Sequence, residues 1–160
     1  MEGTWILGNN YRTKSTLYGS YPPAYLERVR ALCPETPVLH CFSGSLPPIS
    51  GEVRIDLIPS RNPDIVGDAT CLPLRSDSFN LLLADPPYSA QDATKYGTGM
   101  PNRRLVLHEL ARVARKGATL VWLDTQLPMF AKRDWHWWGA ITLIRSSNHR
   151  VRLISFFEKV

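Results

Sequence analysis

Short apolar runs alternate with polar, proline-containing segments along most of the chain. Continuous apolar runs of this length are typical of strands that are covered on both faces. The predicted strands are Val38–Phe42, Glu52–Ile58, Asp64–Gly67, Leu81–Ala84 and Ala118–Asp124. Two further runs, Trp138–Arg145 and Arg150–Glu158, predict a closing antiparallel pair around a polar turn.

Two segments have the spacing of helices. Tyr25–Leu32 follows Pro22-Pro23 and stops before Pro34, so proline bounds it at both ends. Pro101–Lys116 is the stronger helix, because Val106, Leu110 and Val113 fall on one face and Gly117 follows. Residues 1–22 predict a polar, turn-rich N-terminal arm, and Ser89–Met100 predicts a loop.

Strands interleaved with helices indicate an α/β sandwich with a mainly parallel sheet. The 160 residues fit a single domain, 1–160, with 1–22 as its arm. Only about ten residues separate the first two strands, fewer than a parallel crossover with a helix usually needs. If these strands are parallel, their crossover is reduced to a loop.

Composition narrows the class of protein. Hydrophobic residues make up 44% and charged residues 21% of the chain, which excludes a disordered protein. The three cysteines form no CxxC pair, so we expect reduced thiols and no metal site. No apolar run is long enough to cross a bilayer, and the N-terminus lacks the pattern of a secretory signal. We therefore expect a cytoplasmic protein without membrane contact.

The net charge of +5 suits a polyanionic partner such as nucleic acid. It equally suits a solvated positive face without a partner. Charge alone leaves both interpretations open.

The strongest chemical signal is the tetrapeptide Asp85-Pro86-Pro87-Tyr88, directly after the apolar strand Leu81–Ala84. Asp and Pro also suit an ordinary turn that ends a strand. An aromatic residue following them at the carboxyl end of a buried parallel strand instead indicates a ligand site, because ligands in open α/β sheets bind at that edge.

This tetrapeptide resembles the signature of amino-methyltransferases, class I enzymes that use S-adenosylmethionine to methylate exocyclic amines of nucleobases. The resemblance implies a Rossmann-like sandwich with the catalytic residues Asp85, Pro86, Pro87 and Tyr88. The Asp85 carboxylate and the Pro86 carbonyl can each accept one hydrogen of the amine, and the fixed φ of proline orients that carbonyl. Tyr88 offers a flat face on which the base can stack.

Three further segments follow the same family pattern and imply a cofactor site. The segment after the first strand, Phe42-Ser43-Gly44-Ser45, resembles the start of the family's F-x-G-x-G loop, with Phe42 and Gly44 as the matching residues. Asp56, followed by Leu57, ends the second strand, where an acidic residue binds ribose hydroxyls in Rossmann-like folds. By resemblance, Asp68, followed by Ala69, binds the adenine of the cofactor, and Asp85 lies beside the sulfonium.

The segment Tyr18–Pro23 resembles the family's aromatic-x-x-P element, which closes over the methionine end of the cofactor. It places Tyr21 and Pro22 among the expected cofactor-binding residues. A proline-rich arm without such a role is the alternative.

Positive and polar side chains downstream are candidates for contact with nucleic acid. They are Lys95, Asn102, Arg103, Arg104, Lys132 and Arg133. Arg145, His149, Arg150 and Arg152 flank the closing turn and could extend that surface, while His40 and His108 have the simplest explanation as structural residues.

The resemblance implies transfer of a methyl group from S-adenosylmethionine to N6 of adenine in DNA, after the base is flipped out of the duplex. No segment corresponds to a target-recognition domain, so we expect low sequence specificity. Methylation of cytosine N4 in DNA or of adenine N6 in RNA, and a non-catalytic nucleic-acid-binding module on a methyltransferase fold, remain alternatives.

Overall fold

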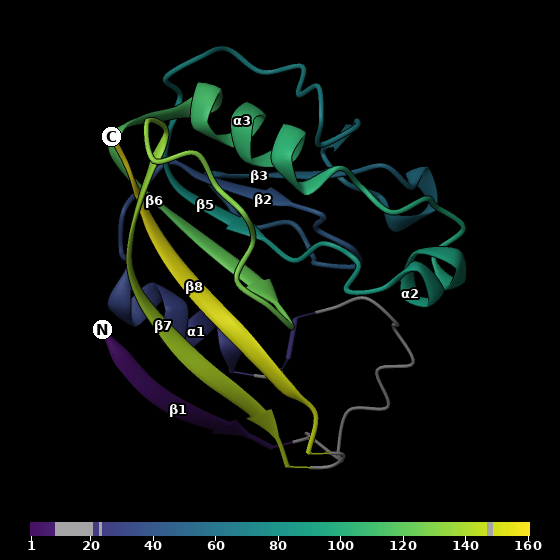
Figure 1. Ribbon diagram of the computed structural model, residues 1–160. Helices are drawn as coiled ribbons and strands as arrows, with labels where there is room; N and C mark the ends of the chain where they lie inside the picture. The colour runs from purple at the N-terminus through teal and green to yellow at the C-terminus, as the bar shows by residue number, and fades with distance from the viewer. Residues whose placement is uncertain (9–20, 23, 147–148) are drawn as a thin grey trace.

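A computed structural model describes residues 1–8, 21–22, 24–146 and 149–160 of the chain. Eight strands within these residues form one sheet in the order β1-β7-β8-β6-β5-β2-β3-β4 (Figure 1). The strands are β1 (Glu2–Leu7), β2 (Val38–Cys41), β3 (Glu52–Asp56), β4 (Ile65–Val66), β5 (Phe79–Ala84), β6 (Ala114–Asp124), β7 (Trp135–Arg145) and β8 (Val151–Lys159).

The helices of the described residues are α1 (Tyr25–Leu32), α2 (Ala90–Lys95), α3 (Arg103–Val113) and the single 3₁₀ turn η1 (Pro59–Arg61). None of them has the length and apolar character needed to cross a bilayer. The boundaries of α1 are those that its flanking prolines predict.

The sheet is mainly parallel. Strands β6, β5, β2, β3 and β4 all run the same way, and β8 is antiparallel to both β6 and β7. The carboxyl ends of the parallel strands therefore meet at one edge, toward which the arrowheads of β5, β6 and β7 point in Figure 1. The expected α/β sandwich with a C-terminal antiparallel hairpin is confirmed.

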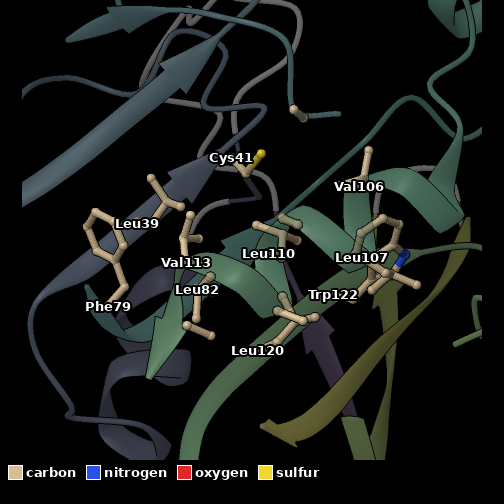
Figure 2. Close-up of a cluster of buried hydrophobic side chains, with 14 of the residues drawn as sticks. Leu39, Cys41, Phe79, Leu82, Val106, Leu107, Leu110, Val113, Leu120 and Trp122 are labelled. Carbon is tan, nitrogen blue, oxygen red and sulfur yellow. The ribbon is translucent and has the colours of Figure 1, made fainter. Parts of the chain in front are cut away.

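Apolar side chains of the strands alternate between two cores. Helix α3 covers one face, where Val106, Leu110 and Val113 are fully buried, and Figure 2 shows these side chains beside those of the strands. Burying each such side chain contributes about 1.5–3 kcal/mol. Helix α1 covers the opposite face with Tyr25 and Val29. We refer to these as the α3 face and the α1 face.

The crossover from β2 to β3 contains no helix, as its length predicts, and the two strands are parallel. Polar contacts hold the loop instead. The buried Arg54 guanidinium donates to the Leu46 carbonyl at 2.6 Å and to both carboxylate oxygens of Asp64 at 2.8 and 3.1 Å. One arginine thereby joins the loop before β3 to the loop after it.

The expectation of a turn-rich arm is wrong at its start, because Glu2–Leu7 forms β1. This strand pairs in parallel with β7 at the edge of the sheet. Most of its side chains are exposed, so it lacks the hydrophobic alternation by which strands are predicted.

The expected helix 101–116 ends earlier than its pattern suggests. Ala114 pairs with Phe79 and begins β6, so the sheet ladder replaces the last helical turn. Gly117, at φ +76°, lies within a register shift of this ladder and does not cap the helix.

The expected loop 89–100 contains the short helix α2. The Ser89 hydroxyl accepts from the Asp92 backbone N–H at 3.1 Å and donates to the Asp92 carboxylate at 2.9 Å. This local N-cap is the sequence signal that could have indicated the helix.

Gly139 allows β1 to dock against β7, and this gives a first prediction. A Cβ at Gly139 would lie 2.7 Å from the Met1 carbonyl oxygen, which accepts a hydrogen bond from the Ala140 N–H at 2.9 Å. We expect Gly139→Ala to lower the free energy of unfolding by about 1–3 kcal/mol, because the backbone of Met1 must move away from the added methyl group. Gly3→Ala, whose Cβ would meet nothing within 4 Å, is the control, and urea denaturation measures both. Equal effects of the two substitutions would contradict this interpretation.

Candidate active site

The segments with predicted chemistry gather at the carboxyl edge of the sheet. Phe42–Ser45 follows β2, Asp56 ends β3, Asp68 and Ala69 follow β4, and Asp85–Tyr88 follows β5. These four strands are neighbours in the order β5-β2-β3-β4. Their parallel direction brings together segments that are spread over more than forty positions of the chain.

Asp85 continues the alternation of Leu81 and Leu83, which belong to the α1 face. The Tyr88 hydroxyl donates to the Asp85 carboxylate at 2.5 Å. The Arg152 guanidinium, from the start of β8, lies 4.9 Å from the centroid of the Tyr88 ring. The carboxylate thus has an O–H donor and a cation close by.

Burial dominates the electrostatics of Asp85 and raises its pKa to about 6, whereas Arg152 and the Tyr88 hydroxyl lower that pKa and Asp124 raises it. Burial and the Asp85 charge also raise the pKa of Tyr88, so this phenol stays protonated and can act as donor. The carboxyl group therefore changes charge close to neutral pH, which suits a group that accepts a proton from a substrate.

Arg103 fixes the backbone of the same tetrapeptide from the α3 face. Its guanidinium donates to the Pro87 and Tyr88 carbonyls at 3.2 and 3.4 Å. It also forms an ion pair with Asp124, at 2.9 Å from Nε to Oδ2. Asp124 ends β6, is fully buried and accepts a further hydrogen bond from the Trp122 indole at 3.3 Å.

The loop after β2 is a tight turn that is tied to the end of β3. Phe42 and Gly44 both adopt positive φ, at +60° and +54°, and the Gly44 N–H donates to the Asp56 carboxylate at 2.8 Å. The second Asp56 oxygen accepts from the Ile58 N–H at 2.9 Å. Ser43 is 2% exposed, and within the described part of the chain its hydroxyl has no hydrogen-bond partner.

Counted from Phe42, the second glycine of the F-x-G-x-G pattern falls at position 46, where this chain has Leu46. The hydroxyl of the preceding residue, Ser45, accepts from Arg61 at 3.0 Å. The serine therefore joins the loop to the 3₁₀ turn after β3. Leu57, next to Asp56, is exposed at the same edge.

Asp68 is exposed and organises a tight turn. One carboxylate oxygen accepts from both the backbone N–H and the hydroxyl of Thr70, each at 2.8 Å. Ala69 is buried beneath it in the core of the α3 face. The second Asp68 oxygen accepts no hydrogen bond from the described residues, so it can receive a ligand amine.

Only Tyr21 and Pro22 of the predicted segment 18–23 are among the described residues. The Tyr21 ring stacks on Tyr25 with centroids 5.2 Å apart, and its hydroxyl lies 3.5 Å from Nδ1 of His40. The other ring nitrogen of His40 lies 2.6 Å from the Glu52 carboxylate. Burial lowers the pKa of His40, so this histidine is neutral and structural, as expected.

Comparison with known proteins supports the fold. No family model and no curated protein matches the sequence. Solved structures do match. TrmN from Thermus thermophilus superposes with a TM-score of 0.64 at 18% identity over 91% of this chain, which spans about half (51%) of the TrmN chain. The N-methyltransferase NodS from Bradyrhizobium japonicum, in complex with S-adenosylhomocysteine, superposes with a TM-score of 0.60 at 12% identity, covering 86% of this chain and 88% of NodS.

A third structure, the 1,6-didemethyltoxoflavin-N1-methyltransferase of Burkholderia thailandensis, gives a TM-score of 0.56 at 10% identity, with coverage of 84% and 76%. The chain has a Rossmann-like methyltransferase fold. This fold confirms the expected architecture.

The candidate nucleic-acid contacts come from several elements of the fold. The Asn102 side chain accepts from the Arg104 and Leu105 N–H groups as the N-cap of α3, and Arg103 is held by Asp124. Arg104 is exposed on α3, and Lys95 ends α2.

Lys132 and Arg133 precede the first residue of β7, whereas the carboxyl edge lies at its last residue, Arg145. A strand of this length spans roughly 30 Å. These two cations are therefore distant from Asp85.

Sequence reasoning missed the roles of Asp124 and Arg152. Asp124 had a signal, because it is a carboxylate that ends an apolar run. Arg152 was named only as a possible extension of the nucleic-acid surface, since its position beside Tyr88 follows from the order of the strands.

The raised pKa of Asp85 predicts a gain in stability when the carboxylate is removed. Its folded pKa of about 6 lies above the ordinary value of about 3.9, so stability falls as pH rises between these two values. We expect Asp85→Asn to stabilise the fold by about 1–3 kcal/mol at pH 8 and to have no effect below about pH 4. Thermal unfolding at both pH values measures this, and a pH-independent difference would contradict it.

The buried Asp124 predicts a strong dependence of stability on Arg103. We expect Arg103→Ala to cost about 3 kcal/mol, because an unpaired carboxylate stays buried, and the double variant Arg103→Ala/Asp124→Asn to recover part of that loss. Arg104→Ala, on the exposed neighbour, is the control for unfolding free energy and should change it by less than about 0.5 kcal/mol. Additive losses in the double variant would refute the coupling.

Proposed function

We propose that the chain is an S-adenosylmethionine-dependent methyltransferase that methylates N6 of adenine in DNA. The observation that carries the proposal is the Asp85–Tyr88 segment, with a proton-accepting carboxylate and an aromatic ring at the carboxyl edge of a methyltransferase fold. An exocyclic amine is a weak nucleophile, because its lone pair is delocalised into the ring. It reacts once its hydrogens are bound by acceptors that favour tetrahedral nitrogen.

The tetrapeptide offers two such acceptors. Asp85 is one, and the Pro86 carbonyl is the other. Arg103 occupies the carbonyls of Pro87 and Tyr88, whereas that of Pro86 receives no hydrogen bond from the described residues. The amine nitrogen loses one proton as it forms its new bond to carbon, and the Asp85 carboxylate can hold that proton.

The residues around the β2 loop fit the cofactor. Bound S-adenosylmethionine would supply a methyl group activated by a sulfonium. Asp56 presents carboxylate oxygens to ribose hydroxyls, and Asp68 presents a free oxygen to an adenine amine. The unpartnered, buried hydroxyl of Ser43 and the positive φ of Gly44 support a ligand close to this backbone.

The choice of adenine in DNA rests on the aspartate in the first position of the tetrapeptide, which in the resembling family is usual for DNA adenine enzymes. The net charge of +5 agrees with a polyanionic substrate. Cytosine in DNA and adenine in RNA share the amine chemistry and are outcomes of the test below.

The deciding experiment offers methyl-labelled S-adenosylmethionine with unmethylated plasmid DNA, RNA or protein, and identifies methylated nucleosides by mass spectrometry. We expect N6-methyldeoxyadenosine, whereas N4-methyldeoxycytidine or methylated RNA adenine would reassign the substrate. Absence of transfer together with absence of cofactor binding would leave a non-catalytic binding module.

The role of Asp85 is tested by Asp85→Ala. We expect transfer to fall at least about 100-fold, because the amine loses its proton acceptor, while cofactor affinity measured by calorimetry changes little. Glu27→Ala, which removes an exposed carboxylate of α1, is the control. Retained activity in Asp85→Ala would refute the assigned mechanism.

A further inference from the structure

Three arginines of the β7–β8 hairpin gather beside the candidate site. Leu143 of β7 pairs with Arg152 of β8, so Arg152 points to the α1 face, where Leu143 is buried. Arg145 lies two positions beyond Leu143 and shares that face. Its N–H donates to the Arg150 carbonyl at 3.3 Å, so all three arginines lie at one end of the hairpin.

That end of the hairpin coincides with the carboxyl edge of β5 and β6. Leu153 pairs with Asp124, the last residue of β6, which places Arg152 next to the end of that strand. The Arg152 guanidinium then reaches the Tyr88 ring, 4.9 Å away. The arginines and the tetrapeptide therefore occupy the same edge and the same face of the sheet.

The like charges of these three arginines, gathered at one end of the hairpin, repel one another. Burial lowers the pKa of Arg145, and the charges of Arg152 and Arg150 lower it further, whereas Tyr88 raises this pKa. No ion pair between Arg152 and a carboxylate within 4.0 Å occurs in the described part of the chain. A bound polyanion would relieve this repulsion.

We propose that Arg145, Arg150 and Arg152 form a phosphate-binding surface that holds the backbone of the nucleic-acid strand whose base enters the site. The inference rests on the proposed function in taking nucleic acid as the substrate. It places the backbone at the hairpin and not at Lys132 and Arg133, which precede the opposite end of β7. Arg152 links this phosphate-binding surface to the tetrapeptide, because its guanidinium also lies over the ring of Tyr88.

Binding is tested apart from catalysis by fluorescence anisotropy with a short labelled duplex DNA over a range of salt concentrations. The test variant is Arg145→Ala/Arg150→Ala, which leaves Arg152 and the tetrapeptide intact. The logarithm of the association constant falls with the logarithm of the salt concentration, and each lost phosphate contact makes this slope shallower by about 0.9. The same loss weakens binding about eightfold at 0.1 M salt. We expect the double variant to bind roughly 10- to 60-fold more weakly, with a slope smaller by up to about 2.

A matched control removes two positive charges from the amino edge. Arg75 and Lys116 are exposed, the first in the segment before β5 and the second near the start of β6, so Arg75→Ala/Lys116→Ala should leave the salt slope unchanged. Arg145→Lys/Arg150→Lys should restore most of the affinity, since charge carries the interaction. Circular dichroism checks that each variant is folded.

The outcomes separate this inference from the proposed function. An unchanged slope in Arg145→Ala/Arg150→Ala, a loss confined to Lys132→Ala/Arg133→Ala, or no binding of any nucleic acid would overturn it. Weakened binding without any methyl transfer would support the surface while refuting the enzyme. Single-stranded DNA and RNA of the same length show which backbone is preferred.

Discussion

The ionisation of Asp85 is the constraint on which the candidate site depends. Burial at the edge of the sheet opposes its negative charge, and Arg152 and the Tyr88 hydroxyl only partly offset that cost, so its pKa rises to about 6. A carboxyl group in this balance can accept a proton near neutral pH, whereas a solvated aspartate would be a much weaker base. The fold thus gives up some stability at this position, as functional sites commonly do.

Two faces of the sheet act together on one tetrapeptide. The side chains of Asp85 and Tyr88 meet Arg152 on the α1 face, while Arg103 holds the backbone carbonyls of Pro87 and Tyr88 together with buried Asp124. This division leaves the side chains available for a ligand while their backbone is fixed. Positioning of this kind is what a direct transfer reaction requires from a protein.

The sequence predicted the strands that are buried on both faces, such as Leu81–Ala84, because continuous apolar runs report burial directly. It missed β1, which is exposed at the edge, and misplaced the end of α3, where pairing of Ala114 with Phe79 overrides helix propensity. The segments of the site were found because each follows a strand. The contacts of Arg103 with Asp124 and of Arg152 with Tyr88 were not, because these partners lie 21 and 64 positions apart and no periodicity links them.

The charge distribution also bears on specificity. Contacts to phosphates fix where a nucleic acid lies, but they carry no information about its sequence, which is read from base edges. The arginines of the β7–β8 hairpin would therefore give affinity for any backbone, and discrimination would rest on the acceptors of the tetrapeptide and the Tyr88 ring. Under the proposed function, those groups would recognise one amine on one base. A chain organised in this way selects the chemistry of the target base and leaves its flanking sequence largely unread.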